Sequence, residues 1–345
     1  MNQIDILNKN LVSSVEDTFS LDLTNGKMGL CIYFYYLSRW EKKEEYQEIA
    51  EKLLNEIINR LSGRMDLSVE IGLSGISLGI SHLIKEKFVE GDINEILEDV
   101  DSRIYQHLFF LKNNELIFQK QELIHYLYYL YVRYTEMSSS DDMFIFQELI
   151  IKTIEMFFNN LKADFFSEKL SFSVKNYQAP LFLYVISKIC SLNFYNKRIE
   201  KIVEDFIITI LSTIPLLHAN RLFLLWGILH IKPYLPNYQK IINFQICLLK
   251  EKIDIEFIMN EELKNQDIYV KDGLSLVYIL LCSIQEKYIE NAIHLNPRTI
   301  YNRIKNSAAW EKLLKNEYYK SIHKGLLNGF PGVNLVLLHI KNHFL

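Results

Sequence analysis

Hydrophobic and polar positions along the chain follow two helical patterns that alternate. Over residues 41–61 the apolar side chains recur every three or four positions, which predicts an amphipathic helix with one buried face. Other segments are apolar on nearly all sides, which predicts helices that are buried on two sides. The amphipathic pattern recurs at 93–110, 143–161, 196–211, 237–253 and 300–314, and the apolar pattern occupies 30–40, 76–84, 123–134, 181–192, 222–231, 274–284 and 333–344.

Three of the apolar segments follow a turn with the pattern G-x-x-G. These turns begin at Gly26, Gly72 and Gly329. Gly72 lies 46 residues after Gly26, and Gly329 lies 257 residues after Gly72, close to five further steps of about 51. Spacings of this size indicate repeated supersecondary units, so we predict seven copies of one helix pair. The four degenerate turns are expected at 121–122, 177–180, 218–221 and 271–273, of which only the last keeps a glycine.

Alternating apolar and amphipathic helices predict an all-α fold, an α/α toroid with an inner and an outer ring. The six prolines and twelve glycines are too few for a β-sandwich or barrel of this length. We expect one domain over residues 1–345. In a toroid all the glycine turns meet at one end, around the central cavity, so a functional site is expected at that rim.

Composition and charge exclude several classes of function. The net charge is −4 with both signs mixed, and no basic block points to nucleic acid. The first residues lack the pattern of a signal peptide, and no apolar run is long enough to span a membrane. The four cysteines are isolated in apolar runs, which predicts buried, reduced thiols in a cytoplasmic protein: Cys31, Cys190, Cys247 and Cys282.

The glycine turns resemble those of the lanthionine synthetase C-like family. The resemblance is most specific at 72–76 (GLSGI) and 329–333 (GFPGV), and in period and helix order it covers most of the chain. It implies a double ring of seven inner and seven outer helices. The family's cyclases add a cysteine thiol of a ribosomally made peptide to dehydroserine or dehydrothreonine. Their zinc ion, held by two cysteines and one histidine in the fifth and sixth turns, lowers the pKa of that thiol.

The residues at those two turns depart from the family's zinc ligands. By the resemblance, Lys271 stands where a cysteine is expected, Asp272 where the histidine is expected, and His218 near the cysteine of the fifth turn. A lysine ammonium cannot bind zinc without losing its proton, and it repels the ion. We therefore predict that the zinc is lost and that no cofactor is bound. Lys271 can instead hold a peptide carboxylate, or the turn can be merely solvated, with Asp272 capping the next helix.

Other candidate residues favour structural roles. His339 and His343 have the spacing of a helical metal pair but no third ligand, and exposed terminal histidines are the simpler interpretation. Asp141 and Asp142 do not complete an aspartate-rich magnesium motif and fit a helix start. A carbohydrate-active toroid would need facing carboxylates, for which the helix starts supply only Glu122 and Asp272.

Tyrosines are concentrated in the third apolar helix, at positions 126, 128, 129, 131 and 134. Most are expected in the core, although some hydroxyl groups could line the cavity and hold an extended peptide. The function expected is a zinc-less pseudo-cyclase that binds a precursor peptide as a scaffold or as the partner of a dehydratase or another modifying enzyme. The alternatives are an active cyclase with an altered site and a carbohydrate-active enzyme.

Overall fold

The computed structural model describes residues 3–61, 65–111, 116–159, 161, 163–264, 268–288, 293 and 296–344. Within these ranges all the regular structure is helical, so the predicted all-α class is confirmed. The chain groups into two compact units: unit 1 is Met1–Val100, Leu263–Ile279 and Leu295–Leu345, and unit 2 is Asp101–Glu262 and Leu280–His294. The single domain over residues 1–345 stays a prediction.

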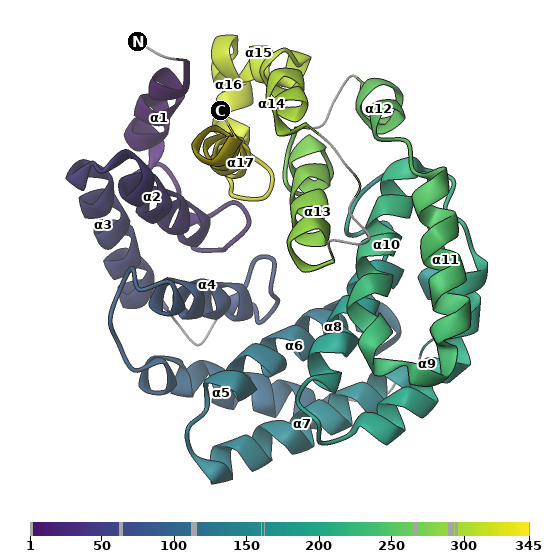
Figure 1. The fold of residues 1–345 in the computed structure, drawn as a ribbon. Coiled ribbons are helices and arrows are strands. Elements are labelled where there is room, and N and C mark those ends of the chain that lie inside the picture. The colour runs from purple at the N-terminus through teal and green to yellow at the C-terminus, as the bar shows by residue number, and fades with distance from the viewer. Residues whose placement is uncertain are drawn as a thin grey trace. The chain divides into compact units, whose positions relative to one another are not determined.

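Unit 1 is built from helices at both ends of the chain. Figure 1 shows α2 between α3 on one side and α17 on the other, and α2 packs against both. Its helices are α1 (Gln3–Ser14), α2 (Lys27–Glu41), α3 (Glu44–Arg60), α4 (Leu73–Lys85), α14 (Pro297–Lys305), α15 (Ala308–Lys315), α16 (Glu317–Ile322) and α17 (Phe330–Phe344). Helices α5 (Ile93–Phe110) and α13 (Leu274–Lys287) contribute residues to both units.

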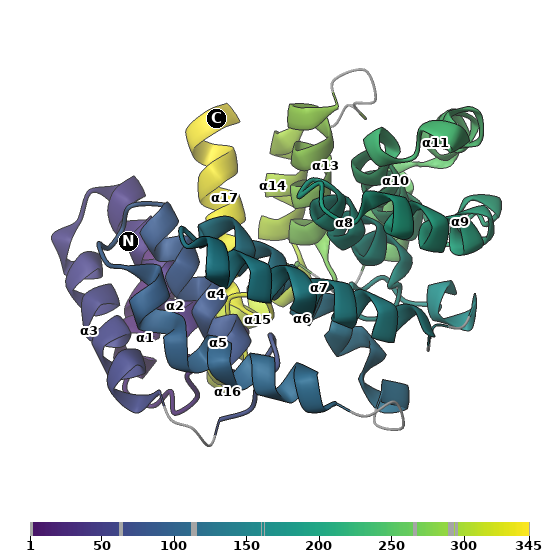
Figure 2. The ribbon, with the colours of Figure 1, turned by 90° about the horizontal axis from the view of Figure 1, so that it is seen from below.

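Unit 2 alternates apolar and amphipathic helices. Figures 1 and 2 show α8 and α10 side by side, with α9 and α11 packed along them. Its helices are α6 (Leu116–Glu136), α7 (Ser140–Asn159), η1 (Ala163–Phe166), α8 (Ala179–Cys190), α9 (Asn196–Ser212), α10 (His218–Ile231), η2 (Lys232–Tyr234), η3 (Pro236–Tyr238), α11 (Gln239–Lys252), α12 (Ile255–Phe257) and the π-helix η4 (Ile258–Glu262). The alternation is the one expected of an α/α toroid.

The helix boundaries correct the sequence analysis in three places. The helix expected at 300–314 is two helices, because the Ser307 hydroxyl accepts a hydrogen bond from the Trp310 N–H (3.1 Å) and starts α15 there. The third apolar helix begins at Leu116, so 121–122 lies inside a helix and is not a turn. Helices α1 and α16 were not anticipated, because neither carries a long apolar repeat.

Each G-x-x-G phrase is the start of a helix rather than a turn before it. Gly72 is the N-cap residue of α4, and Gly75 already lies in the first helical turn. A Cβ atom built on Gly75 would lie 1.9 Å from the carbonyl oxygen of Val69, and one on Gly332 would lie 1.9 Å from that of Leu326. In both cases the carbonyl belongs to the residue six positions upstream. The second glycine is therefore required by close backbone approach, and φ is not positive there.

A buried polar cluster joins the first and last helices of unit 1. The Tyr33 hydroxyl on α2 donates to the Asn8 Oδ1 on α1 (2.5 Å) and accepts from the Asn334 Nδ2 on α17 (2.7 Å). All three side chains are buried, and burial raises the pKa of Tyr33 well above its ordinary value. A buried hydroxyl with both a donor and an acceptor partner fixes the relative positions of the three helices. The first and last repeats are thus neighbours, as the toroid requires at this point.

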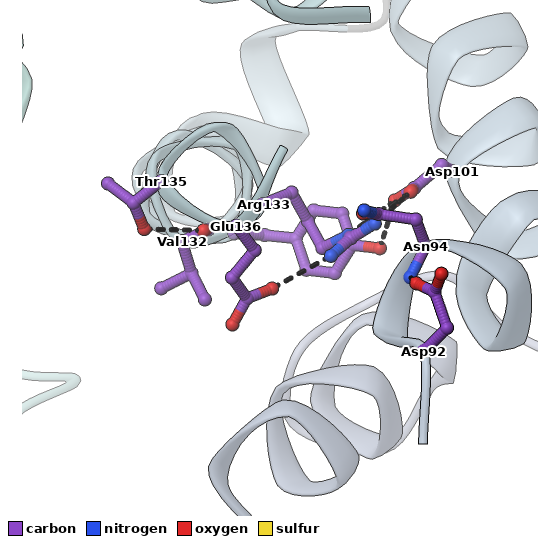
Figure 3. Close-up of polar contacts among 8 residues, drawn as sticks. Asp92, Asn94, Asp101, Val132, Arg133, Thr135 and Glu136 are labelled. Atoms are coloured by element: carbon purple, nitrogen blue, oxygen red, sulfur yellow. Dashed lines mark hydrogen bonds and ion pairs between the residues drawn. The ribbon is translucent and has the colours of Figure 1, made fainter. Parts of the chain in front are cut away.

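A buried arginine links α5 and α6 in unit 2 (Figure 3). Arg133 on α6 donates to Asp101 through Nη2 (2.9 Å) and Nε (3.1 Å), and to Glu136 through Nη1 (2.8 Å). The Tyr129 hydroxyl donates to the same Asp101 carboxylate (2.6 Å). Burial acts to lower the pKa of Arg133, but the two carboxylates outweigh it and the pKa is raised. The charge is thus retained and paired inside the protein.

Candidate functional site

Four of the helix-start turns in unit 1 form one connected row. The Lys271 N–H donates to the Leu327 carbonyl (3.1 Å), the Leu327 N–H donates to the Thr24 carbonyl (3.4 Å), and the Thr24 hydroxyl donates to the Glu70 carbonyl (2.7 Å). The order is therefore sixth, seventh, first and second repeat. We call these turns, at 268–275, 323–332, 20–29 and 66–75, the turn row. Their proximity agrees with the expectation that the turns meet at one end.

The sixth turn folds like the second, although it has lost one of its two glycines. The Ser275 hydroxyl donates to the Ile268 carbonyl, and the Ser74 hydroxyl donates to the Leu67 carbonyl, both at 2.5 Å. In each case the carbonyl lies seven residues upstream of the serine. This equivalence places Lys271 and Asp272 at the end of the sixth turn, just before the helix, as the sequence alignment of the repeats predicts.

Lys271 and Asp272 are both half-buried at the turn row. Burial raises the pKa of the Asp272 carboxyl above its ordinary value, while the charges of Lys271 and His323 act in the opposite direction. Asp272 is thus a partly desolvated carboxyl beside the ammonium of Lys271. The arrangement can pair with a peptide group of either charge, because an ammonium and a carboxyl lie on adjacent residues.

His323 is a member of this site that sequence reasoning missed. Its ring stacks on Tyr269 (centroids 4.7 Å, planes 4° apart) and packs against Tyr319 at a tilt (centroids 4.1 Å, planes 39° apart). Its Nδ1 lies 2.8 Å from the Asn328 carbonyl oxygen. Because a carbonyl can only accept, Nδ1 carries the proton and Nε2 is an acceptor in the neutral ring. The sequence gives only a weak indication of His323, namely its position seven residues before Phe330. In the structure the Phe330 N–H donates to the carbonyl of His323 (3.0 Å).

His218 lies in unit 2, at the first residue of α10. Its Nδ1 accepts from the Asp254 N–H (3.0 Å), and its Nε2 lies 3.1 Å from the Arg221 Nη1. The ring also packs on Phe257 (4.9 Å). Both ring nitrogens therefore face donors, one of them cationic. Of the three predicted site residues, Lys271 and Asp272 thus lie side by side in unit 1, and His218 lies in unit 2.

Two glutamates accept hydrogen bonds from the fifth turn and the start of α10. Glu262 accepts from the N–H groups of His218 (2.6 Å) and Ala219 (2.9 Å), at the start of α10. Glu168 accepts from the Asn220 Nδ2 (2.9 Å) and from the Leu216 N–H. Carboxylates at a helix N-terminus satisfy free N–H groups and the helix dipole. These caps come from distant segments, so nothing near position 218 in the sequence indicates them.

The residues at the two turns do not fit a zinc ion. At the sixth turn the Lys271 ammonium, next to Asp272, repels a divalent cation. At the fifth turn both ring nitrogens of His218 already face donors, the Asp254 N–H and the Arg221 guanidinium. In the part of the chain that the structure describes, no three residues of His, Cys, Asp or Glu are grouped so that they could hold a metal ion. We therefore derive no step of a mechanism through zinc.

The cysteines supply no replacement ligand at the turn row. Cys31 and Cys190 are buried on α2 and α8, and burial raises the pKa of both thiols. The expectation that all four are buried is wrong: Cys247 is exposed on the solvent face of α11, and Cys282 is half-buried. None of these four cysteines forms a disulfide bond. Cys247 is exposed because α11 has only a narrow apolar stripe on its buried face.

The remaining candidate residues, the C-terminal histidines, the Asp141–Asp142 pair and Glu122, lie within helices. The expectation that both C-terminal histidines are exposed is wrong for His339, whose Nδ1 lies 2.9 Å from the Tyr278 hydroxyl, whereas His343 is exposed. Asp141 and Asp142 lie in the first turn of α7, as expected for a helix start. Glu122 lies within α6, so it does not mark a helix start as the carbohydrate hypothesis assumed.

The tyrosines of α6 divide between the core and a half-exposed face. Tyr126 and Tyr129 are buried, as expected. Tyr128, Tyr131 and Tyr134 are half-buried, and Tyr128 continues into a contact with Tyr184 on α8 (6.1 Å). If tyrosine hydroxyl groups of α6 hold an extended peptide, those on this half-exposed face are the ones that can do so.

Fold and site together define an all-α protein of repeated helix pairs whose apolar helices start at glycine turns. Residues 17–177, just under half of the 345 residues, match the family model described as "Lanthionine synthetase C-like protein". That span contains the first two glycine turns, and the match supports the resemblance to this family that was predicted from them. No curated protein matches the chain. Among the described helices, none combines the length and apolar character that crossing a membrane requires.

Proposed function

We propose that the protein binds a ribosomally made precursor peptide without zinc, as a scaffold or as the partner of a modifying enzyme such as a dehydratase. The observation that carries the proposal is the Lys271–Asp272 pair, which occupies a turn of the family's fold where the resemblance implies zinc ligands. The surrounding backbone is intact, because Ser275 keeps the hydrogen bond that Ser74 makes in the second turn. In this proposal the side chains that would bind zinc are replaced, while the backbone of the turn that would position them is retained.

The chemistry of the turn row suits recognition of a peptide. The half-buried ammonium of Lys271 can pair with a peptide carboxylate, and the Asp272 carboxyl can accept peptide N–H groups. The hydrogen bonds between Lys271, Leu327, Thr24 and Glu70 use backbone groups in every turn, so the row is held in place before a ligand arrives. A site that is ordered in advance loses less entropy on binding.

A second candidate is a thioether-forming cyclase that acts without zinc, and His323 favours it. Nδ1 of His323 donates to the Asn328 carbonyl, so Nε2 of the neutral ring can accept a proton from a cysteine thiol. The thiolate sulfur would then bond to the β-carbon of a dehydroserine, and the α-carbon would take up a proton. We expect thioether formation in this scheme to be slower than with zinc, because a neutral imidazole accepts the thiol proton but, unlike a metal ion, does not lower the pKa of the thiol beforehand.

The first test is the zinc content of the purified protein, measured by elemental mass spectrometry after zinc loading and dialysis. The proposal expects far less than one zinc per chain. About one tightly held zinc per chain would overturn it, because the sixth turn would then not be the site at which zinc chemistry was lost. Incubation with a dehydrated, cysteine-containing peptide, followed by thiol alkylation and mass spectrometry, separates the two candidates: loss of alkylatable thiol supports the cyclase, and its persistence supports the scaffold.

The second test is peptide binding by the variants Lys271→Ala and Asp272→Ala, with Lys341→Ala as the control. Lys341 is exposed near the end of α17 and lies outside the turn row. Weaker binding by both turn-row variants, with binding by the control unchanged, is the expected result. Equal binding by all three would remove the turn row from the proposal.

A further inference from the structure

A pocket of about 340 Å³ lies in unit 1 between α1, α15, α16 and the seventh turn. It is separate from the Lys271–Asp272 pair, which does not line it. Its volume is at the lower end of the range of ligand sites, which begins near about 300 Å³. A pocket of this size accommodates one large side chain with its neighbouring main chain.

The pocket has an apolar wall. Leu7 and Leu11 of α1 face it together with Leu313 of α15 and Phe330 of α17. Each of these four side chains is buried in the protein core, so the wall is fixed and does not have to form on binding. Serine and asparagine residues also line it and can hydrogen-bond a peptide main chain. The wall therefore fits an aliphatic or aromatic side chain whose flanking amides remain at the surface.

One cation at the pocket is left for a ligand. Lys320 lines the pocket but is bonded to Glu317 (2.5 Å). Lys324 also lines it, is half-buried, and makes no ion pair within the ranges that the structure describes. Asp17 contributes the remaining carboxylate, at an exposed position beyond the end of α1. A carboxylate that enters beside Lys324 would pair with its ammonium.

The pocket adjoins the turn row through His323. His323 lines the pocket, and its carbonyl accepts the Phe330 N–H (3.0 Å) at the start of α17. The same loop accepts the Lys271 N–H at Leu327. A peptide bound at the turn row thus has an apolar pocket next to it, on the same turn.

We propose that this pocket anchors the peptide by one apolar side chain and that Lys324 pairs with an acidic residue next to that side chain. The inference rests on the proposed function, because the ligand is a peptide. It goes further by naming the class of segment that is recognised, an apolar residue beside Asp or Glu. It also places the anchor outside the turns to which the resemblance assigns the family's zinc ligands.

Two variants and two controls test the pocket. Ser321→Phe fills it from an exposed position and leaves the core unchanged, and Ser102→Phe introduces the same side chain at an exposed position on α5. Lys324→Glu reverses the charge at the pocket, and Lys341→Glu reverses it on the exposed end of α17. Circular dichroism and the melting temperature establish that all four variants fold.

The ligand is found with a displayed library of random ten-residue peptides selected on the full chain. Enriched peptides are then labelled with fluorescein and titrated by fluorescence anisotropy. We expect the enriched peptides to share an apolar residue beside Asp or Glu, and Ser321→Phe and Lys324→Glu each to weaken binding by about tenfold, the effect of losing one anchoring contact. The controls should bind as the wild type does.

The outcomes separate the two proposals. If enriched peptides bind Ser321→Phe and Lys324→Glu with wild-type affinity, the pocket proposal is wrong and peptide binding stands. Enriched peptides without the apolar–acidic pattern contradict the predicted ligand class. If no peptide is enriched, the proposed function itself is wrong, and the pocket proposal falls with it.

Discussion

The second glycine of each G-x-x-G phrase offers a direct test of why the phrase recurs. In Gly75→Ala the new Cβ would lie 1.9 Å from the Val69 carbonyl oxygen, so the two must separate by about 1.5 Å to reach ordinary contact at 3.4 Å. The first turn of α4 is tied to that loop by the Leu73 N–H (2.8 Å) and by the Ser74 hydroxyl (2.5 Å). Moving the helix away from the loop breaks both hydrogen bonds.

The free energy of unfolding should fall by about 2–4 kcal/mol in Gly75→Ala. Two lost hydrogen bonds cost about 2 kcal/mol together, and crowding adds about 1–3 kcal/mol. The higher helix propensity of alanine returns about 1 kcal/mol. Gly332→Ala should lose a similar amount, because its Cβ would meet the Leu326 carbonyl at the same 1.9 Å.

The assay is urea unfolding followed by far-ultraviolet circular dichroism, with Gly91→Ala as the control. A Cβ on Gly91 would meet the flexible ends of Ile96, at 3.0 Å, and Ile84, at 3.9 Å, and no backbone atom, so its effect should stay within about 0.5 kcal/mol. The reasoning is refuted if Gly75→Ala unfolds at the same urea concentration as Gly91→Ala and the wild type. The glycine would then not be required by close approach.

Three further predictions concern buried and exposed side chains. Arg133→Leu should lower the free energy of unfolding by about 3–5 kcal/mol, because it leaves the Asp101 carboxylate without its cation; a loss below about 1 kcal/mol in urea unfolding would contradict this. Burial, with two nearby lysines, lowers the pKa of His230 to about 4, so the unfolded chain binds the proton first and stability falls between pH 6.5 and 4. Wild type should therefore lose about 2 kcal/mol more than His230→Gln between pH 7.5 and pH 5, and equal losses would refute the assignment. The exposed Cys247 should react with a disulfide reagent in the native protein while Cys31, whose pKa is raised by burial, stays unmodified until unfolding; mass spectrometry shows which thiol is labelled.

Helices with long periodic patterns could be predicted from the sequence, because burial of one face requires that period. The predicted 93–110 and 196–211 agree with α5 and α9 to within a residue. The prediction of one helix at 300–314 failed because the apolar period continues across a cap at Ser307. Capping depends on one hydroxyl and one N–H, which periodicity does not detect.

Site residues could be predicted from the sequence only where they occupy a fixed position in the repeated unit. Lys271 and Asp272 were found because Gly273 fixes the repeat's register at the sixth turn. His323 was missed because its role comes from Tyr269 and Tyr319, which approach it only in the folded unit. Arg133 was missed for the same reason: a lone arginine in an apolar run gives no sign of the carboxylate that will face it.

The buried cluster of Asn8, Tyr33 and Asn334 has a consequence for synthesis of the chain. A ribosome releases residues 8 and 33 some three hundred residues before residue 334, so the hydroxyl of Tyr33 has no donor during most of translation. The internal contacts of unit 2 all lie upstream of residue 295, so that unit can complete first although it starts later. The first hundred residues must then wait, with their apolar faces uncovered, for α17 to emerge. In a growing cell this segment is the one that we expect a chaperone to hold.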